Sequence, residues 1–268
     1  MKTPLVNVDI PSIYKNAQGA PVPLPKRLAQ ATPDMANAIG MLAKDLQAHG
    51  GRLVLSDLFR SYEMQLQSHL DYVKGKKTAF SPPPGGSFHE AGRAMDVSLS
   101  DLHMSLSNFW DIAKNRGFVP IIDTPNASLS EAWHFECRGS HQLVIDYYRA
   151  KKGNNFAKPY TAGAASAILA IGVHVDMFGD AQKEAQLQAL LIRCGHDIGN
   201  LDGAIGPSTR AALTALGLAD AGLDDALAQV EALAQTKFPS EFSAPAPTSV
   251  ALDNGFATHI PDHVVLNG

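Results

Sequence analysis

The sequence predicts an α+β fold, with an antiparallel-sheet domain followed by a small three-helix domain. Before residue 150, stretches of helical periodicity mix with short stretches that alternate with a period of two, without a regular βαβ repeat. Beyond the segment 153–159 the chain becomes rich in alanine and leucine, and almost every strand pattern disappears. We therefore divide the chain into an extended N-terminal segment, a first domain, a helical domain and a tail, covering residues 1–32, 33–158, 163–238 and 239–268.

The first domain begins with alternating helical and extended patterns. Residues 1–32 are rich in proline and lack periodicity, which favours an extended, loop-like segment. From Pro33 onward apolar residues recur at helical spacing until His49-Gly50-Gly51, which ends the helix. The remaining expected elements of this domain are a strand at 52–56, a helix at 61–73, a proline-rich loop at 81–86, a strand at 94–99, a helix at 102–115, and strands at 118–122 and 133–136.

The helical domain shows its own start and stop residues. Leu187, Leu190 and Leu191 form a helical stripe that ends at Gly195. Pro207 suits the first turn of a second helix. A third helix is expected at 223–234, and the linker-like tail after it is expected to be poorly ordered or to dock late.

Composition excludes several classes of protein. The 268 residues contain no run of about eighteen apolar residues, so we expect no membrane span. The net charge of −4 argues against a protein that binds the nucleic-acid backbone. Cys137 and Cys194 lie far apart and form no CxxC pair, so we expect two buried thiols and not a disulfide.

Two segments bring together the residues that metal chemistry requires. The first runs from Ser87 to Asp96 and contains His89, and the second ends in His134. A catalytic zinc ion typically has three protein ligands and one position for water. His89, Asp96 and His134 are therefore the predicted ligands of one zinc ion per chain, with an ordinary buried polar cluster as the alternative.

Glu131 is the predicted general base. It lies three residues before His134, near the start of the same expected strand. Zinc lowers the pKa of bound water from about 15.7 to about 7, and a carboxylate can then move its proton to the leaving amine. The alternative for Glu131 is a surface carboxylate.

Arg60 follows a predicted strand, and its guanidinium could bind an oxyanion or a terminal carboxylate with two parallel hydrogen bonds. The alternative for Arg60 is a structural salt bridge. Trp133 is predicted to form a wall of the core or of the substrate pocket. The other histidines lack a spaced set of partners and are expected to have no such role; they are His49, His69, His103, His141, His174, His196, His259 and His263.

The order Ser-x-His-x-x-Gly-x-Ala-x-Asp, followed by Glu-x-x-His, resembles the D-Ala-D-Ala metallopeptidases. This group includes vancomycin-resistance-type D,D-carboxypeptidases, L,D-carboxypeptidases and phage endolysin peptidases. Phe-Arg-Ser-Tyr at 59–62 is similar to the arginine-bearing segment of the family, and the resemblance covers about residues 33–150. The matching residues are Ser87, His89, Gly92, Ala94, Asp96, Glu131 and His134.

The resemblance implies an α+β sheet domain and a role for each matching residue. The two histidines and the aspartate would hold zinc, Glu131 would be the base, and Arg60 would contact the substrate. Ser87 would help to bind the peptide or its carboxylate, although a loop-capping role explains this serine equally well.

Residues 163–238 are similar to the small three-helix peptidoglycan-binding domain. The similarity rests on Asp-Gly-x-x-Gly-Pro-x-Thr at 202–209. Thr214-Ala215-Leu216 stand where that domain usually has a bulky aromatic residue. A tight turn at Asp202-Gly203 is the alternative explanation of the motif.

Together these patterns predict a zinc-dependent hydrolase that cleaves an amide bond next to a D-amino acid in peptidoglycan stem peptides, as a D,D- or L,D-carboxypeptidase. One alternative is an endopeptidase that cuts cross-links, as an endolysin or as an antibacterial effector. Another is a peptidase that acts on D-peptides outside the wall. A third, of a different class, is a non-catalytic zinc-containing wall-binding protein, against which Glu131 argues because a binder needs no base.

The expected place of action is the periplasm or the cell wall, with peptidoglycan as the partner. Lys2 is followed by no apolar segment, so no signal peptide is visible in the sequence. Delivery through a phage holin, contact-dependent secretion, or loss of a leader from the sequence would each account for this. Contact-dependent delivery would imply an immunity protein as a second partner.

Overall fold

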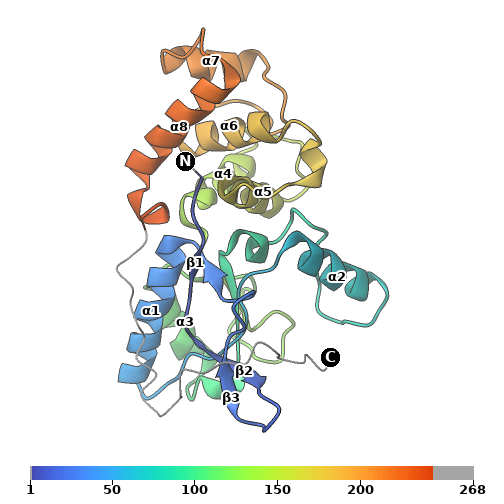
Figure 1. Ribbon diagram of the computed structural model, residues 1–268, viewed down its shortest axis with the longest axis vertical. Coiled ribbons are helices and arrows are strands. Elements are labelled where there is room, and N and C mark those ends of the chain that lie inside the picture. The colour runs from blue at the N-terminus through green and yellow to red at the C-terminus, as the bar shows by residue number, and fades with distance from the viewer. Residues whose placement is uncertain (1, 244–268) are drawn as a thin grey trace.

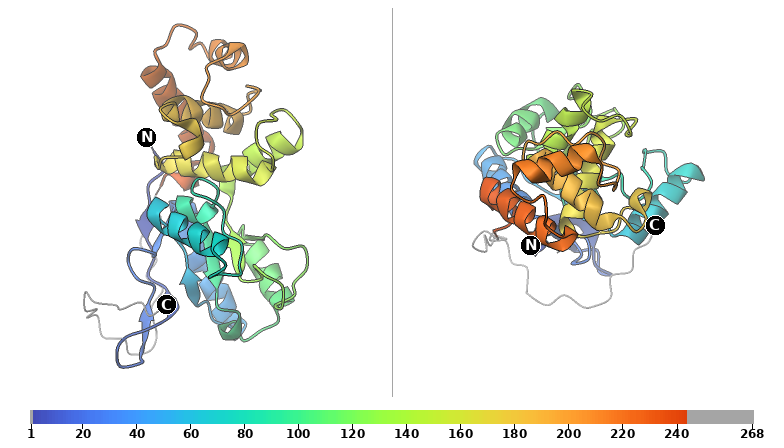
Figure 2. Two further views of the ribbon diagram at one scale, coloured as in Figure 1. Left: turned by 90° about the vertical axis from the view of Figure 1, so that its right-hand side faces the viewer. Right: turned by 90° about the horizontal axis from the view of Figure 1, so that it is seen from above.

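The structure is a computed structural model, and it describes residues 2–243. A sheet with its flanking helices forms one half of the molecule, and a group of helices stacks on it along the longest axis (Figure 1). The left view of Figure 2 shows the same division from the side. Most of the predicted tail, residues 244–268, lies outside the described residues, and the part before it includes the short 3-10 helix η5 (Pro239–Glu241).

The main sheet has six strands in the order β3-β2-β5-β6-β8-β7. Neighbouring strands are antiparallel except β2 and β5, which run parallel with Ser12 opposite Leu55. The predicted α+β class, with a mainly antiparallel sheet, is therefore confirmed for this half. The strands span Pro11–Lys15 (β2), Pro21–Pro23 (β3), Leu55–Asp57 (β5), Ala94–Val97 (β6), Val119–Pro120 (β7) and His134–Glu136 (β8).

The two faces of the central strands have different surroundings. Met95, Val97 and Phe135 belong to one apolar cluster with α1 (Pro33–Ala48) and α3 (Leu106–Lys114). Successive side chains of a strand point to opposite faces. Asp96 and His134 therefore face away from these two helices.

The helices of this half begin close to where the sequence predicts them. Pro33 occupies the first turn of α1, and the helix ends at Ala48, just before His49. The Ser61 hydroxyl accepts a hydrogen bond from Met64 N and caps α2 (Tyr62–Val73). Gln65 is the one buried residue of α2. This agrees with Figure 1, in which α2 projects from the rest of the molecule.

Residues 1–32 differ from the loop-like expectation, because they contain four short strands. β1 (Val6–Asn7) and β4 (Gln30–Ala31) pair with each other, while β2 and β3 form one edge of the main sheet. Proline lacks a backbone N–H, but an edge strand tolerates this because one side needs no partner. The prolines of β3 therefore favoured a loop in the sequence, although the segment forms an edge strand.

Several boundaries also differ. The strand expected at 52–56 starts later, at Leu55, and the strand expected at 94–99 ends at Val97. The helix expected at 102–115 begins at Leu106, because a separate 3-10 turn, η2 (Leu99–Asp101), precedes it.

The second half is entirely helical in its regular structure. Within 163–238, where three helices were expected, the structure has α6, α7, α8 and most of α5. Cys137 and Cys194 are buried and free, as predicted. Between residues 2 and 243, no helix is both long and apolar enough to cross a membrane. The helices span Gln142–Arg149 (α4), Pro159–Ile171 (α5), Gln182–Arg193 (α6), Pro207–Ala215 (α7) and Leu223–Lys237 (α8), with the turn η4 at Asp176–Phe178.

The Asp202-Gly203 motif forms a turn between α6 and α7. Gln188 Oε1 accepts hydrogen bonds from Asp202 N at 3.0 Å and from Gly203 N at 2.7 Å. Gly203 has a φ of 78°, which favours glycine. These contacts are those of the tight turn that was the alternative explanation of the motif.

The two halves share one apolar cluster. Phe88, Ala91 and Ala94, from the segment that carries the predicted metal ligands His89 and Asp96, pack with residues of α4 to α8. The N-terminal segment also reaches the helical half, where Thr3 N donates to Ala170 O at 2.9 Å. The helical half is therefore packed directly behind this segment.

A buried ionic network joins the same two halves. Arg93, Arg193 and Glu241 are each at most 2% exposed. Glu241 lies 2.5 Å from Arg193 Nη2 and 3.5 Å from Arg93 Nη2, and Arg93 also contacts Asp34 at 2.9 Å. Because isolated buried charges are costly, these groups depend on one another.

We expect Glu241→Gln to lower the free energy of unfolding by about 3–5 kcal/mol, because it leaves buried arginines short of a carboxylate. Urea denaturation measures this change. As a control, Asp224→Asn breaks an exposed pair with Lys183 and is expected to cost less than about 1 kcal/mol. Equal stability of Glu241→Gln and the parent would contradict a structural role for the network.

Candidate metal centre

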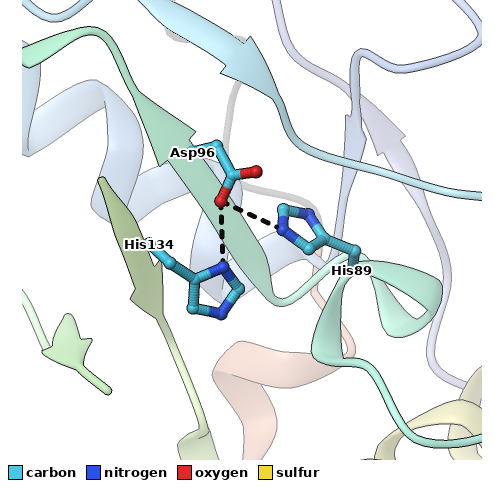
Figure 3. Close-up of side chains that lie close together, drawn as sticks. All are labelled: His89, Asp96 and His134. Atoms are coloured by element: carbon cyan, nitrogen blue, oxygen red, sulfur yellow. Dashed lines mark hydrogen bonds and ion pairs between the residues drawn. The ribbon is translucent and has the colours of Figure 1, made fainter. Parts of the chain in front are cut away.

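Two histidines and one aspartate from three different elements meet at one point (Figure 3). His89 lies on the 3-10 turn η1 (Phe88–Ala91), Asp96 on β6 and His134 on β8. Asp96 and His134 are directly opposite each other in the antiparallel register of the two strands. The ligand atoms of the three residues all lie within 4.8 Å of one another.

The turn that presents His89 is fixed locally. Ser87 Oγ accepts a hydrogen bond from His89 N at 3.3 Å, and the Glu90 carboxylate accepts one from Ser87 N at 3.2 Å. Gly92 ends the turn with a φ of 61°, and a Cβ there would lie 3.1 Å from the backbone Cα of Ala31. The glycine of the motif is therefore required by both conformation and space.

Asp96 Oδ1 is the centre of the cluster. It lies 2.9 Å from His134 Nδ1 and 3.2 Å from His89 Nε2. The second nitrogen of each ring has its own partner: His89 Nδ1 donates to Leu58 O at 2.8 Å, and His134 Nε2 lies 3.4 Å from Glu136 Oε1. These outer contacts can hold the one proton that each ring keeps when its inner nitrogen binds a metal.

The electrostatics of the cluster favour a cation. Burial opposes ionisation of Asp96, but the neighbouring His89 and His134 hold the pKa of Asp96 well below its usual range. Burial also disfavours charge on His134, whereas its hydrogen bonds to Asp96 and Glu136 raise the pKa of His134 to about 10. Two imidazoles and one carboxylate are a donor set that zinc accepts, and the three residues fit such an ion.

Glu131 was expected near the start of the strand that contains His134. In the structure it lies instead in the turn before β8. It has a φ of 68°, a conformation that few residues other than glycine adopt, and its carbonyl accepts from His134 N at 3.0 Å. Glu131 Oε1 is buried and has no hydrogen-bond partner among residues 2–243. Burial raises the pKa of the Glu131 carboxyl, which makes the carboxylate a stronger base than an exposed one.

Arg60 lies beside the cluster. Its Nε is 2.6 Å from Asp57 Oδ2, and its Nη2 is 3.3 Å from Asp96 Oδ2. The structural salt bridge considered for Arg60 therefore exists, and the same guanidinium also borders the cluster. Asp96 consequently directs one oxygen to the imidazoles and the other to Arg60.

The cluster opens into a cavity of about 510 Å³. Glu131, Arg60, Ser87 and Trp133 all line it. Ser87 also caps η1, so its position is compatible with both roles considered for it. The cavity residues that the sequence analysis missed include Lys77, Arg138, Arg149, Lys158 and Tyr160.

Glu136 was also missed, although one pattern could have revealed it. It is fully buried two residues after His134, and alternate residues of a strand share a face. Its second oxygen lies 2.5 Å from Arg138 Nε. Tyr160 comes from α5, and burial together with the nearby Glu136 carboxylate raises the pKa of Tyr160 well above its usual range.

Comparison with protein families gives one match. Residues 29–121 match the VanY family, described as D-alanyl-D-alanine carboxypeptidase. The matched segment contains Arg60, His89 and Asp96 and ends before Glu131. The match confirms the resemblance that the motifs predict. No curated protein matches the chain.

Two solved structures are similar to this chain over about half of its length. The LD-carboxypeptidase LdcB, whose structure concerns peptidoglycan recognition, is 19% identical with a TM-score of 0.38, over 49% of this chain and 66% of LdcB. The L,D-carboxypeptidase DacB from Streptococcus pneumoniae is 26% identical with a TM-score of 0.32, over 50% of this chain and 85% of DacB. The chain thus spans about two thirds of the LdcB structure.

We expect Glu136→Gln to weaken zinc binding by about 10–100-fold, because a neutral amide orients and polarises His134 less well than a carboxylate. Competition with a chelating dye measures the affinity. Glu63→Gln, an exposed change on α2, is the matched control. Unchanged affinity in Glu136→Gln would remove Glu136 from the support of the metal site.

We also expect zinc binding near neutral pH to release about one proton, because His134 carries a proton in the metal-free protein and must lose it to become a ligand. Calorimetric titrations in buffers of different ionisation enthalpy count the released protons. Affinity should fall as the pH falls, since protons compete for the same nitrogen. A binding enthalpy that is independent of the buffer would refute this expectation.

Proposed function

We propose that this chain is a zinc-dependent carboxypeptidase that removes a C-terminal D-amino acid from peptidoglycan stem peptides. The observation that carries the proposal is the meeting of His89, Asp96 and His134 in a cavity that Glu131 also lines. The match to a carboxypeptidase family supports the peptide substrate and favours the release of a terminal residue over the cutting of cross-links.

In this proposal His89, Asp96 and His134 hold one zinc ion. When bound, the ion would polarise the scissile carbonyl and make a water molecule acidic enough to attack at neutral pH. The chain supplies what such an ion needs, namely three buried ligands whose outer contacts to Leu58 and Glu136 fix their orientation.

Glu131 moves the proton in the proposed reaction. Its carboxylate accepts a proton from the attacking water as the new C–O bond forms, and it gives that proton to the amine nitrogen as the C–N bond breaks. The unpartnered and buried Oε1 atom leaves one oxygen free for this transfer. General acid–base transfer of this kind contributes about 10²–10⁴-fold to a rate.

Arg60 would steady the negative charge that develops on the carbonyl oxygen. Its guanidinium is held by Asp57 at 2.6 Å, so it borders the cavity in a fixed orientation. A preorganised donor gains more from a developing charge than a mobile one, because it needs no reorientation during the reaction. Ser87 and Trp133, on the same cavity wall, would contact the peptide.

The proposed place of action is outside the cytoplasmic membrane, where stem peptides occur, with peptidoglycan as the partner. The helical residues 163–238 would hold the enzyme near the wall and raise the local concentration of substrate. Because these helices also pack behind the segment that carries His89 and Asp96, they would support the active site as well.

We expect Glu131→Ala to retain zinc and lose hydrolysis by about 10²–10⁴-fold, because the metal ligands remain while the proton acceptor is removed. Mass spectrometry of pentapeptide and tetrapeptide muropeptides measures the product, and elemental analysis measures the bound zinc. Glu63→Gln again serves as the control, since its side chain is exposed. Cleavage by Glu131→Ala at the parental rate would refute the proposed mechanism.

A further inference from the structure

Lys77 is a charged group of the cavity to which the proposed reaction gives no role. It lies on the loop after α2, lines the same cavity as Arg60 and Glu131, and is partly buried. Across residues 2–243, its ammonium has no ion pair with a carboxylate. Its Nζ donates to Ser68 Oγ at 3.0 Å, a neutral partner.

A chain of hydrogen bonds fixes Lys77 relative to Arg60. Arg60 Nη1 donates to Gln65 Oε1 at 3.3 Å, and Gln65 Nε2 donates to Ser81 Oγ at 3.1 Å. The Ser81 hydroxyl donates to Ser68 Oγ at 2.9 Å, and Ser68 accepts from Lys77. Gln65 and Ser81 are fully buried, so the middle of the chain is shielded from water, while its two ends lie at the cavity that Arg60 and Lys77 both line.

The surroundings of Lys77 call for an additional anion. Burial lowers the pKa of Lys77, Arg60 lowers it further by repulsion, and Asp96 and Glu131 oppose both effects. Neither carboxylate forms an ion pair with Lys77 within residues 2–243: Asp96 contacts two imidazoles and Arg60, and Glu131 has the proposed role of base. An anionic group on the ligand would remove the repulsion between the two cations.

The other cations of the cavity are in a different situation. Arg138 is paired with the buried Glu136 at 2.5 Å, and Arg149 with Asp146 at 3.3 Å. Lys158 is exposed and lies over the ring of Phe80, 5.9 Å from its centroid. Lys77 is thus the partly buried cation whose charge has no carboxylate partner within the described chain.

We propose that Lys77 binds the terminal carboxylate of the peptide substrate and thereby makes the enzyme specific for a free C-terminus. This inference rests on the proposed function. The released amino acid carries its carboxylate on the carbon next to the scissile nitrogen, so both groups enter the same cavity. In this arrangement Arg60 binds the carbonyl oxygen of the scissile bond, and Lys77 binds the terminal carboxylate. A peptide whose terminal carboxyl group is blocked as an amide gains nothing from the ammonium.

The test compares two peptides that differ in one group: a stem pentapeptide with a free terminal carboxylate and the same peptide as a C-terminal amide. We expect the parent to prefer the acid by about 10–100-fold in kcat/KM, as for a hydrogen bond between charged groups. Lys77→Met should lose this preference through the acid alone, with the amide rate unchanged. Lys77→Arg should restore most of it, and Lys76→Met, at an exposed neighbour, should behave as the parent.

Two results would overturn the inference: cleavage of acid and amide at equal rates by the parent, or an equal loss for both peptides in Lys77→Met. Calorimetric binding of the same peptides to zinc-loaded Glu131→Ala, with and without Lys77→Met, separates this inference from the proposed function. A Lys77-dependent preference for the acid in binding, without cleavage by the parent, would retain the role of Lys77 and refute the peptidase. Binding without any preference for the acid would refute the role of Lys77, whatever the parent cleaves.

Discussion

Asp96 lies between two imidazoles, and this contact constrains much of the surrounding structure. The three groups are buried, and such groups are tolerated together only when each finds a partner. The antiparallel register of β6 and β8 supplies His134, and the turn that ends at Gly92 supplies His89. A shift of either strand by one residue would move its ligand to the face covered by α1 and α3. The register and the chemistry are therefore coupled.

The helical half reaches the same site from behind. Tyr160, at the start of α5, lies beside Glu136, and Glu136 in turn contacts His134. Phe88 and Ala91, on either side of the His89 turn, belong to the apolar cluster of these helices. The helical half therefore contributes to the metal site itself, because it packs against the residues that orient the proposed ligands His89 and His134.

The sequence predicted the site through short motifs, and local geometry controls the one that contains two of the three metal ligands, His89 and Asp96. The spacing from His89 through Gly92 to Asp96 describes a turn followed by a strand, and both are short-range features. Lys77 and Tyr160 join the cavity through packing of distant segments, for which the sequence offers no periodic pattern. The turn that holds Glu131 was likewise hidden, because a positive φ at a glutamate follows from no propensity rule. In the fold, edge prolines concealed β3, whereas the apolar stripe of α1 predicted that helix almost to the residue.

The buried contact between Arg93 and Glu241 bears on how the protein is made. The two residues lie 148 positions apart in the sequence (241 − 93), so the ribosome releases Arg93 long before its partner. Until η5 emerges, this arginine has only Asp34 as a carboxylate partner, and Arg193 lacks its own. Translation must therefore pass η5 before both halves can close, and a nascent chain truncated ahead of η5 would leave two arginines without the carboxylate that the folded protein buries beside them.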